Sequence, residues 1–138
     1  MGKGKMMKKF LLMLLLICSS TSIVFAKDKQ CKPATHAKVP AITEFTYHKA
    51  RKALLAAGWQ PLQIVRWPEV DERLSGQARK FWEKGYVEVE DCAGTGVPPC
   101  VFLFKDAYGN HLRVTTAGEE YPEEKSHAGV TGFRFVCE

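Results

Sequence analysis

Two closely spaced glutamates are candidates for acid–base chemistry in this chain. Glu88 and Glu90 stand two residues apart, next to Asp91. Paired carboxylates do general acid–base work where burial separates their pKa values. The alternating pattern of this segment instead predicts that both glutamates point to water. A small hydrolase that uses Glu88, Glu90 or His111 is therefore a secondary hypothesis, and we expect no catalytic residue.

The four histidines could take part in metal binding or acid–base chemistry. They are His36, His48, His111 and His127, and none lies four residues from another His or a Cys on a predicted helix. Metal sites need ligands that converge, and this spacing is a common way to achieve it on a helix. We place His36 in an N-terminal arm, His48 on the exposed side of a helix and His127 in an acidic loop. The sequence therefore predicts surface histidines, no metal site and no cofactor.

Four of the five cysteines form an even set outside the N-terminal segment: Cys31, Cys92, Cys100 and Cys137. Four cysteines allow three pairings. A turn-rich connection joins Cys92 to Cys100, whereas Cys31 and Cys137 lie near the two ends of the remaining chain. We favour the pairs Cys92–Cys100 and Cys31–Cys137. Disulfides persist in oxidising compartments, so the cysteine pattern indicates a periplasmic or secreted protein.

The first 26 residues have the pattern of a secretory signal peptide. A basic start is followed by an apolar run over residues 10–18 and by Val24, Phe25 and Ala26 at the expected cleavage position. The apolar run is too short to span a bilayer. We expect cleavage before Lys27, no lipid on Cys18 and no membrane span.

The charge of the chain changes once this leader is set aside. The chain has 20 Lys+Arg and 15 Asp+Glu, and the leader holds four lysines and no acid. The remaining 112 residues carry 16 basic and 15 acidic side chains. This balance removes the electrostatic argument for binding nucleic acid or an anionic membrane.

The elements that position these residues follow from periodicity. Apolar residues at helical spacing predict a helix over residues 47–57, with Thr46 as its N-cap and Gly58 as its stop, and a weaker helix over 71–84. Alternation predicts strands, and Gly109 predicts a hairpin turn at 106–110. The predicted strands are 62–66, 86–90, 101–104, 111–116 and 130–137.

Together these elements predict one α+β domain. One or two helices pack on one face of a four- to five-stranded antiparallel sheet that the two disulfides staple. Residues 46–138 form this domain, residues 27–45 form an extended N-terminal arm tied down at Cys31, and residues 1–26 form the signal peptide. The size allows a single domain.

Aromatic residues at the ends of elements are the sequence's main indication of function. Trp and Tyr are over-represented among binding hot spots. We expect Trp59 and Trp82 to pack at the edge of the core, and Trp67, Tyr108 and Tyr121 to be binding residues, with Trp67 exposed. The leading hypothesis is a monomeric, non-catalytic protein-binding or inhibitor-like module whose partner is an unidentified envelope or extracellular protein. The alternatives are the hydrolase, a small-ligand-binding protein and a structural envelope component.

Two segments carry a resemblance to known proteins. The helix pattern Tyr47-x-x-Ala50-Arg51-x-x-Leu54-x-x-x-Gly58-Trp59-x-Pro61 is followed by Cys92-Ala93-Gly94-Thr95-Gly96 and Cys100. This combination resembles a group of small secreted bacterial proteins, and the resemblance covers residues 47–137. It implies a small α+β periplasmic domain and no particular activity. A more distant likeness, in layout only, is to the half-domain of secreted β-lactamase inhibitor proteins.

Overall fold

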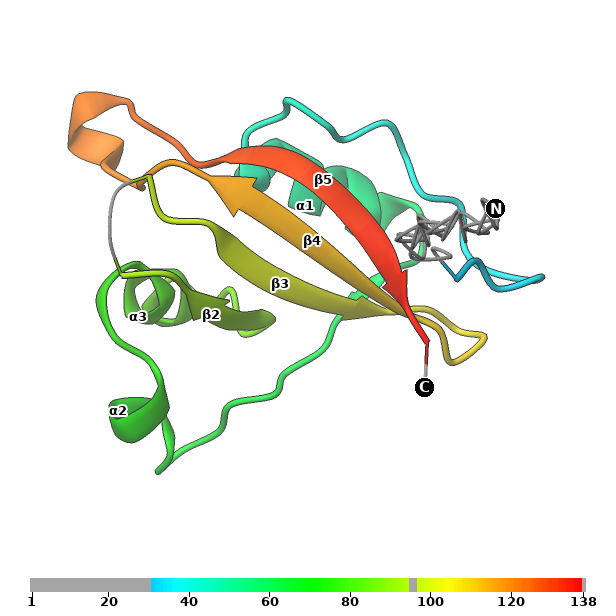
Figure 1. Ribbon diagram of the computed structural model, residues 1–138, viewed down its shortest axis with the longest axis horizontal. Helices are drawn as coiled ribbons and strands as arrows, with labels where there is room; N and C mark the ends of the chain where they lie inside the picture. Colours follow the sequence, from blue (N-terminus) through cyan, green and yellow to red (C-terminus); the bar gives the residue numbers. More distant parts are fainter. Residues whose placement is uncertain (1–30, 95–96, 138) are drawn as a thin grey trace, which may run out of the picture.

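The computed structural model describes residues 31–94 and 97–137, and its centre is a five-stranded antiparallel sheet (Figure 1). β3 pairs with β4, and β4 pairs with β5, while β1 and β2 both pair with the other edge of β3. The predicted α+β class is confirmed. The predicted leader lies outside the described residues. The strands are β1 (Gln60–Pro61), β2 (Val89–Cys92), β3 (Cys100–Lys105), β4 (His111–Ala117) and β5 (Gly129–Val136).

The first helix forms where the sequence predicts it. α1 spans Tyr47–Ala56, and the Thr46 hydroxyl accepts a hydrogen bond from the Lys49 N–H at 3.4 Å. This cap satisfies one of the free N–H groups of the first turn. Gly58 follows the helix with a φ of +94°, a conformation that costs glycine little. The other helices are α2 (Val70–Arg73), α3 (Gly76–Glu83) and the 3₁₀ turn η1 (Pro122–Glu124).

Two helices pack on the same face of the sheet. The Tyr47 ring of α1 stacks on the Phe102 ring of β3 with centroids 3.6 Å apart, and the Phe81 ring of α3 meets Phe102 edge-on at 4.9 Å. In Figure 1, α1 lies behind β4 and β5, and α3 lies beside β2. The core between these layers holds fully buried aliphatic and aromatic side chains, among them Leu54, Leu112 and Val114.

Three predicted elements differ from the structure. Two are strands at the β3 edge that pairs with β1 and β2, and the third is the helix between them in the chain. Residues 62–66 are not a strand, because β1 ends at Pro61 and β2 occupies the rest of the β3 edge. At Leu103 the segment that pairs with this edge of β3 changes. The Leu103 carbonyl accepts from the Leu62 N–H, and the Leu103 N–H donates to the Glu88 carbonyl, each at 2.9 Å. The helix predicted over 71–84 is two helices, because the backbone is extended at Leu74 and Ser75, and Gly76 begins α3 with a φ of +52°. The strand predicted at 86–90 begins only at Val89, after a turn.

The remaining predicted strands and both disulfides are confirmed. The pairs are Cys92–Cys100 and Cys31–Cys137. The arm is held at more points than Cys31, contrary to expectation: the Ala37 N–H donates to Asp106 at 2.9 Å, and the Trp59 indole donates to the Lys38 carbonyl at 3.0 Å. Within residues 31–94 and 97–137, no helix has the length and apolar character that crossing a bilayer requires.

Candidate functional site

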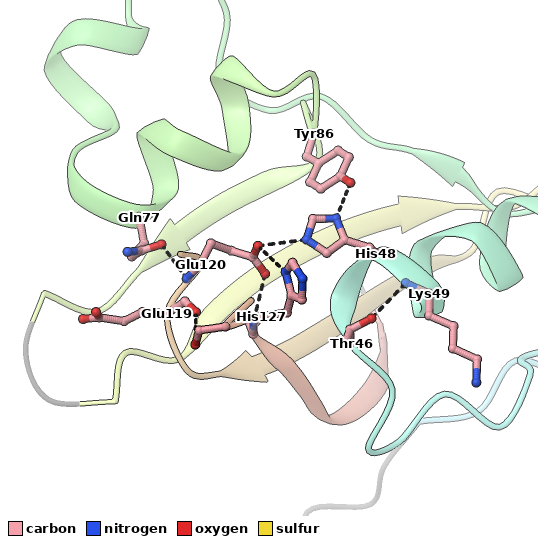
Figure 2. Close-up of polar contacts among 10 residues, drawn as sticks. Thr46, His48, Lys49, Gln77, Tyr86, Glu119, Glu120 and His127 are labelled. Carbon is pink, nitrogen blue, oxygen red and sulfur yellow. Dashed lines mark hydrogen bonds and ion pairs between the residues drawn. The ribbon is translucent and has the colours of Figure 1, made fainter. Parts of the chain in front are cut away.

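A buried carboxylate, Glu120, collects three hydrogen bonds where α1 meets the loop between β4 and β5 (Figure 2). The His48 Nε2 atom lies 2.8 Å from Glu120 Oε2, and the His127 Nδ1 atom lies 3.1 Å from the same oxygen. The Ala128 N–H donates to the other oxygen at 2.8 Å. Glu120 is only 2% exposed. We call His48, Glu120 and His127 the His–Glu–His cluster.

Backbone contacts explain why these distant segments meet. The Tyr47 N–H donates to the Ala128 carbonyl at 2.8 Å, so the first turn of α1 is fixed beside the start of β5. From the opposite side, the Gln77 side chain of α3 accepts from the Glu120 N–H at 3.2 Å. Gly118, with a φ of +97°, turns the chain out of β4 before Glu120. The cluster is therefore held by α1, α3 and the sheet together.

Tyr86 extends this network toward the surface. Its hydroxyl hydrogen-bonds to His48 Nδ1, so both nitrogens of that imidazole have partners (Figure 2). Burial raises the pKa of Tyr86, an effect that Arg51 opposes and that the charges of Glu120 and Glu88 reinforce. The hydroxyl therefore stays protonated at neutral pH and is a hydrogen-bond donor.

A second buried carboxylate, Glu88, is bound by side chains of α1. The Tyr47 hydroxyl donates to Glu88 Oε1 at 2.7 Å, and the Arg51 Nε donates to the same oxygen at 2.6 Å. The prediction that Glu88 points to water is wrong. β2 begins at Val89, three residues later than predicted, so Glu88 lies at the end of a turn and its side chain faces α1. Glu90 is half-buried and pairs with Arg113 at 3.0 Å.

The charges of this region are stabilised by their partners. Burial disfavours the ionised form of Glu120, but the hydrogen bonds from His48, His127 and Ala128 outweigh it and lower the pKa of this carboxyl group. Desolvation acts against the charged form of Arg51, and the hydrogen bond to Glu88 overcomes it, so the pKa of Arg51 is raised. Arg51 is therefore a fixed cation.

A groove of about 540 Å³ runs along α1 beside Tyr86. The Arg51 guanidinium lies 4.7 Å from the centroid of the Tyr86 ring. Among the described residues, those that line this groove include no carboxylate. They are Thr46, His48, Lys49, Arg51, Lys52, Leu55 and Tyr86.

The aromatic residues predicted to bind a partner do not gather in one place. Trp67 is 57% exposed, as predicted, and rests edge-on against Trp82 at 5.3 Å. Tyr108 is 64% exposed in the turn between β3 and β4, near the end of the sheet where the chain terminates (Figure 1). Tyr121 follows Glu120 at the start of η1, with the Lys80 ammonium 4.8 Å from its ring centroid. These residues define three separate surfaces.

Sequence spacing did not identify the residues that the structure brings together. His48 and His127 have ring centroids 5.0 Å apart, yet one lies on a helix and the other in a loop, so no helical repeat connects them. The remaining histidines are elsewhere: His36 lies against Phe135, and His111 begins β4. One usable signal was present, because Tyr47 and Arg51 are four residues apart and so reach the same point beside α1.

Comparisons of the chain with protein-family models, curated proteins and solved structures gave no match. The resemblance to small secreted bacterial proteins stays a prediction.

Proposed function

We propose that this protein is a non-catalytic periplasmic or secreted binding protein that takes a small anionic ligand with an apolar body in the groove along α1. Both disulfides support the compartment, because such bonds persist where thiols are oxidised. The observation that carries the ligand class is the concentration of cations along one groove.

Three cations contribute to that groove from two turns of one helix. Lys49 and Lys52 are exposed, and Arg51 is held by Glu88 at 2.6 Å. An anchored guanidinium loses little conformational freedom when it binds a carboxylate, phosphate or sulfonate. A cleft lined by charges of one sign attracts ligands of the opposite sign. These features favour an anionic head group.

The rest of the groove favours an apolar ligand body. Leu55 is 39% exposed, which leaves an aliphatic side chain uncovered, and the Tyr86 ring supplies a flat aromatic surface. A volume of about 540 Å³ fits within the range of pockets that hold small molecules, roughly 300–1,000 Å³. Free phosphate alone would leave this surface unused.

The same groove does not favour catalysis. Its strongest potential base is His48, but Nδ1 is bonded to Tyr86 and Nε2 to Glu120. A general base needs a nitrogen within reach of the proton that it removes. His48 in this arrangement positions the Tyr86 hydroxyl and does not offer a free lone pair to a ligand.

Titration with anilinonaphthalene sulfonate, a fluorescent anion with apolar rings, tests the proposal. We expect saturable binding that weakens about tenfold in Lys49→Gln/Lys52→Gln, since each lost charge interaction is on the order of 1 kcal/mol or less. Leu55→Glu should weaken binding further because it places a like charge in the groove. The control is Lys105→Gln, an exposed lysine on β3 outside the groove. If the two groove variants bound the dye as tightly as the Lys105→Gln control, the proposal would be contradicted.

A second candidate function is the protein-binding module that the sequence predicts. The exposed Trp67 packs on Trp82, and the Arg79 guanidinium lies 5.4 Å from its ring centroid. Trp and Arg are the residue types most enriched in hot spots. Loss of a captured envelope protein in Trp67→Ala, with capture retained in Tyr108→Ala, would support this alternative.

A further inference from the structure

We infer that the His–Glu–His cluster binds a divalent transition-metal ion, with zinc as the best match. Two imidazole nitrogens and one carboxylate oxygen form the ligand set of several mononuclear zinc sites. The three ligand atoms, from His48, Glu120 and His127, lie within 4.8 Å of one another. This inference goes beyond the ligand groove and does not depend on it.

The distances between ligand atoms suit a zinc ion. Two ligands about 2.0–2.1 Å from a tetrahedral zinc are roughly 3.3 Å apart. His48 Nε2 and His127 Nδ1 lie 2.8 and 3.1 Å from Glu120 Oε2. Binding the ion would bring the two ring nitrogens, which with the carboxylate oxygen lie within 4.8 Å of one another, to this spacing. Each ring would then carry its proton on the nitrogen that does not bind the ion, so His48 Nδ1 would donate to the Tyr86 oxygen.

The groups around the cluster are those that hold metal ligands in place. Imidazoles that bind a metal use their second nitrogen in a hydrogen bond that fixes the ring, and His48 Nδ1 has such a partner in the Tyr86 hydroxyl. The Ala128 N–H holds Glu120 Oε1 at 2.8 Å, which leaves Oε2 for the ion. Two of the three ligands are thus already oriented by neighbouring groups.

Exposure defines how an ion would enter. The Glu120 side chain is 1% exposed, whereas those of His48 and His127 are 30% and 36% exposed. The cluster is therefore closed on the carboxylate side and reaches solvent on the side of the two rings. Three protein ligands leave a fourth position for water on this open side. The hydrogen bonds already satisfy the carboxylate, so folding does not require the metal.

Isothermal titration calorimetry with zinc sulfate tests the inference on oxidised protein that carries no histidine tag. We expect one zinc ion per chain, and at least tenfold weaker binding in His127→Ala, a half-exposed position whose change the fold should tolerate. His36→Ala and His111→Ala are matched controls and should bind zinc as the unchanged protein does. Absence of binding, or equal affinity in His127→Ala, would overturn the inference.

Cobalt substitution gives a second readout. Cobalt(II) in a site of four or five ligands shows visible absorption far stronger than that of the hydrated ion. We expect this absorption in the unchanged protein and its loss in His48→Ala/His127→Ala. Strong absorption that survives in the double variant would show that cobalt binds elsewhere and would contradict the assignment. Because Lys49→Gln/Lys52→Gln leaves all three ligands in place, it should retain the absorption even if the proposed ligand groove fails its own test.

Discussion

His48 and Glu120 are 72 residues apart in the chain, yet His48 Nε2 lies 2.8 Å from a carboxylate oxygen of Glu120. The contact forms because the first turn of α1 is bonded through its backbone to Ala128, at the start of β5. The same turn also lines the groove, through Thr46, His48 and Lys49. One end of α1 therefore connects the proposed metal site to the proposed ligand groove through Tyr86.

The structure distinguishes two glutamates that the sequence treats alike. Glu88 is fully buried and accepts from Tyr47 and Arg51, so Glu88→Ala leaves the buried Tyr47 hydroxyl and the partly exposed Arg51 guanidinium without their acceptor. We expect a loss of about 3–5 kcal/mol in the free energy of unfolding, measured by urea denaturation. The matched change Glu90→Ala breaks a half-exposed pair and should cost about 1 kcal/mol or less. Equal losses would show that Glu88 is not the buried partner of Arg51.

Local patterns in the sequence predicted much of the fold for physical reasons. The period of α1, its Thr46 cap and the left-handed Gly58 are properties of a short segment, and so is the alternation that buries Leu112 and Val114 on one face of β4. The disulfide pairs followed from the turn-rich connection between Cys92 and Cys100 and from the placement of the other two cysteines. Apart from the Cys31–Cys137 pair, which joins residues 106 positions apart, these features need no knowledge of distant contacts.

The site depends on contacts that no local pattern contains. The alternating pattern predicted a solvent-exposed Glu88 side chain because Glu88 was expected to lie in a strand. In the structure β1 and β2 share one edge of β3, and this sharing decides where β2 begins. The sequence predicted an acidic surface loop around Glu120 and His127, but contacts with α1, α3 and Ala128 hold Glu120 in a buried position. A single sequence does not show which loop a helix terminus will contact.

Trp67 and Trp59 should respond differently to truncation. Trp67 is 57% exposed, whereas Trp59 is 1% exposed and donates to the Lys38 carbonyl. Trp67→Ala should cost about 1 kcal/mol or less of stability, against about 3–5 kcal/mol for Trp59→Ala. Thermal and urea unfolding of both variants measure the difference. A large destabilisation in Trp67→Ala would place this residue in the core and remove it as a binding anchor.

The two disulfides should contribute unequally to stability. Cys31–Cys137 closes a sequence separation of 106, and Cys92–Cys100 a separation of 8. In the chain-entropy model the long loop stabilises by about 4–5 kcal/mol and the short loop by about 2–3 kcal/mol. The double variants Cys31→Ser/Cys137→Ser and Cys92→Ser/Cys100→Ser, compared by urea denaturation, test this order. A larger loss in the second variant would mean that loop entropy does not dominate.

Acid should weaken the anchor of the N-terminal arm through Asp106. Desolvation disfavours its charge, but hydrogen bonds from Asn110, Ala37 and Tyr108 prevail and lower the pKa of this carboxyl group. The Asp106 carboxyl group has a lower pKa in the folded chain than in the unfolded chain, where the pKa is about 3.9. Its charge therefore stabilises the fold at pH values above the unfolded pKa. This stabilisation is lost as the pH falls through the folded pKa. The stability difference between the unchanged protein and Asp106→Asn should therefore shrink below about pH 4. A difference that stays constant from neutral pH to pH 3 would refute this account.

The most direct test of the proposed function is an NMR titration of the ¹⁵N-labelled protein with sodium octanoate, a carboxylate with an apolar chain. The groove predicts that the amide shifts change most at residues 46–55 of the chain and at Tyr86, and that Leu55→Glu abolishes these changes. Shift changes centred on Trp67 and α3, or no changes at concentrations that saturate small-molecule sites, would contradict a ligand groove along α1.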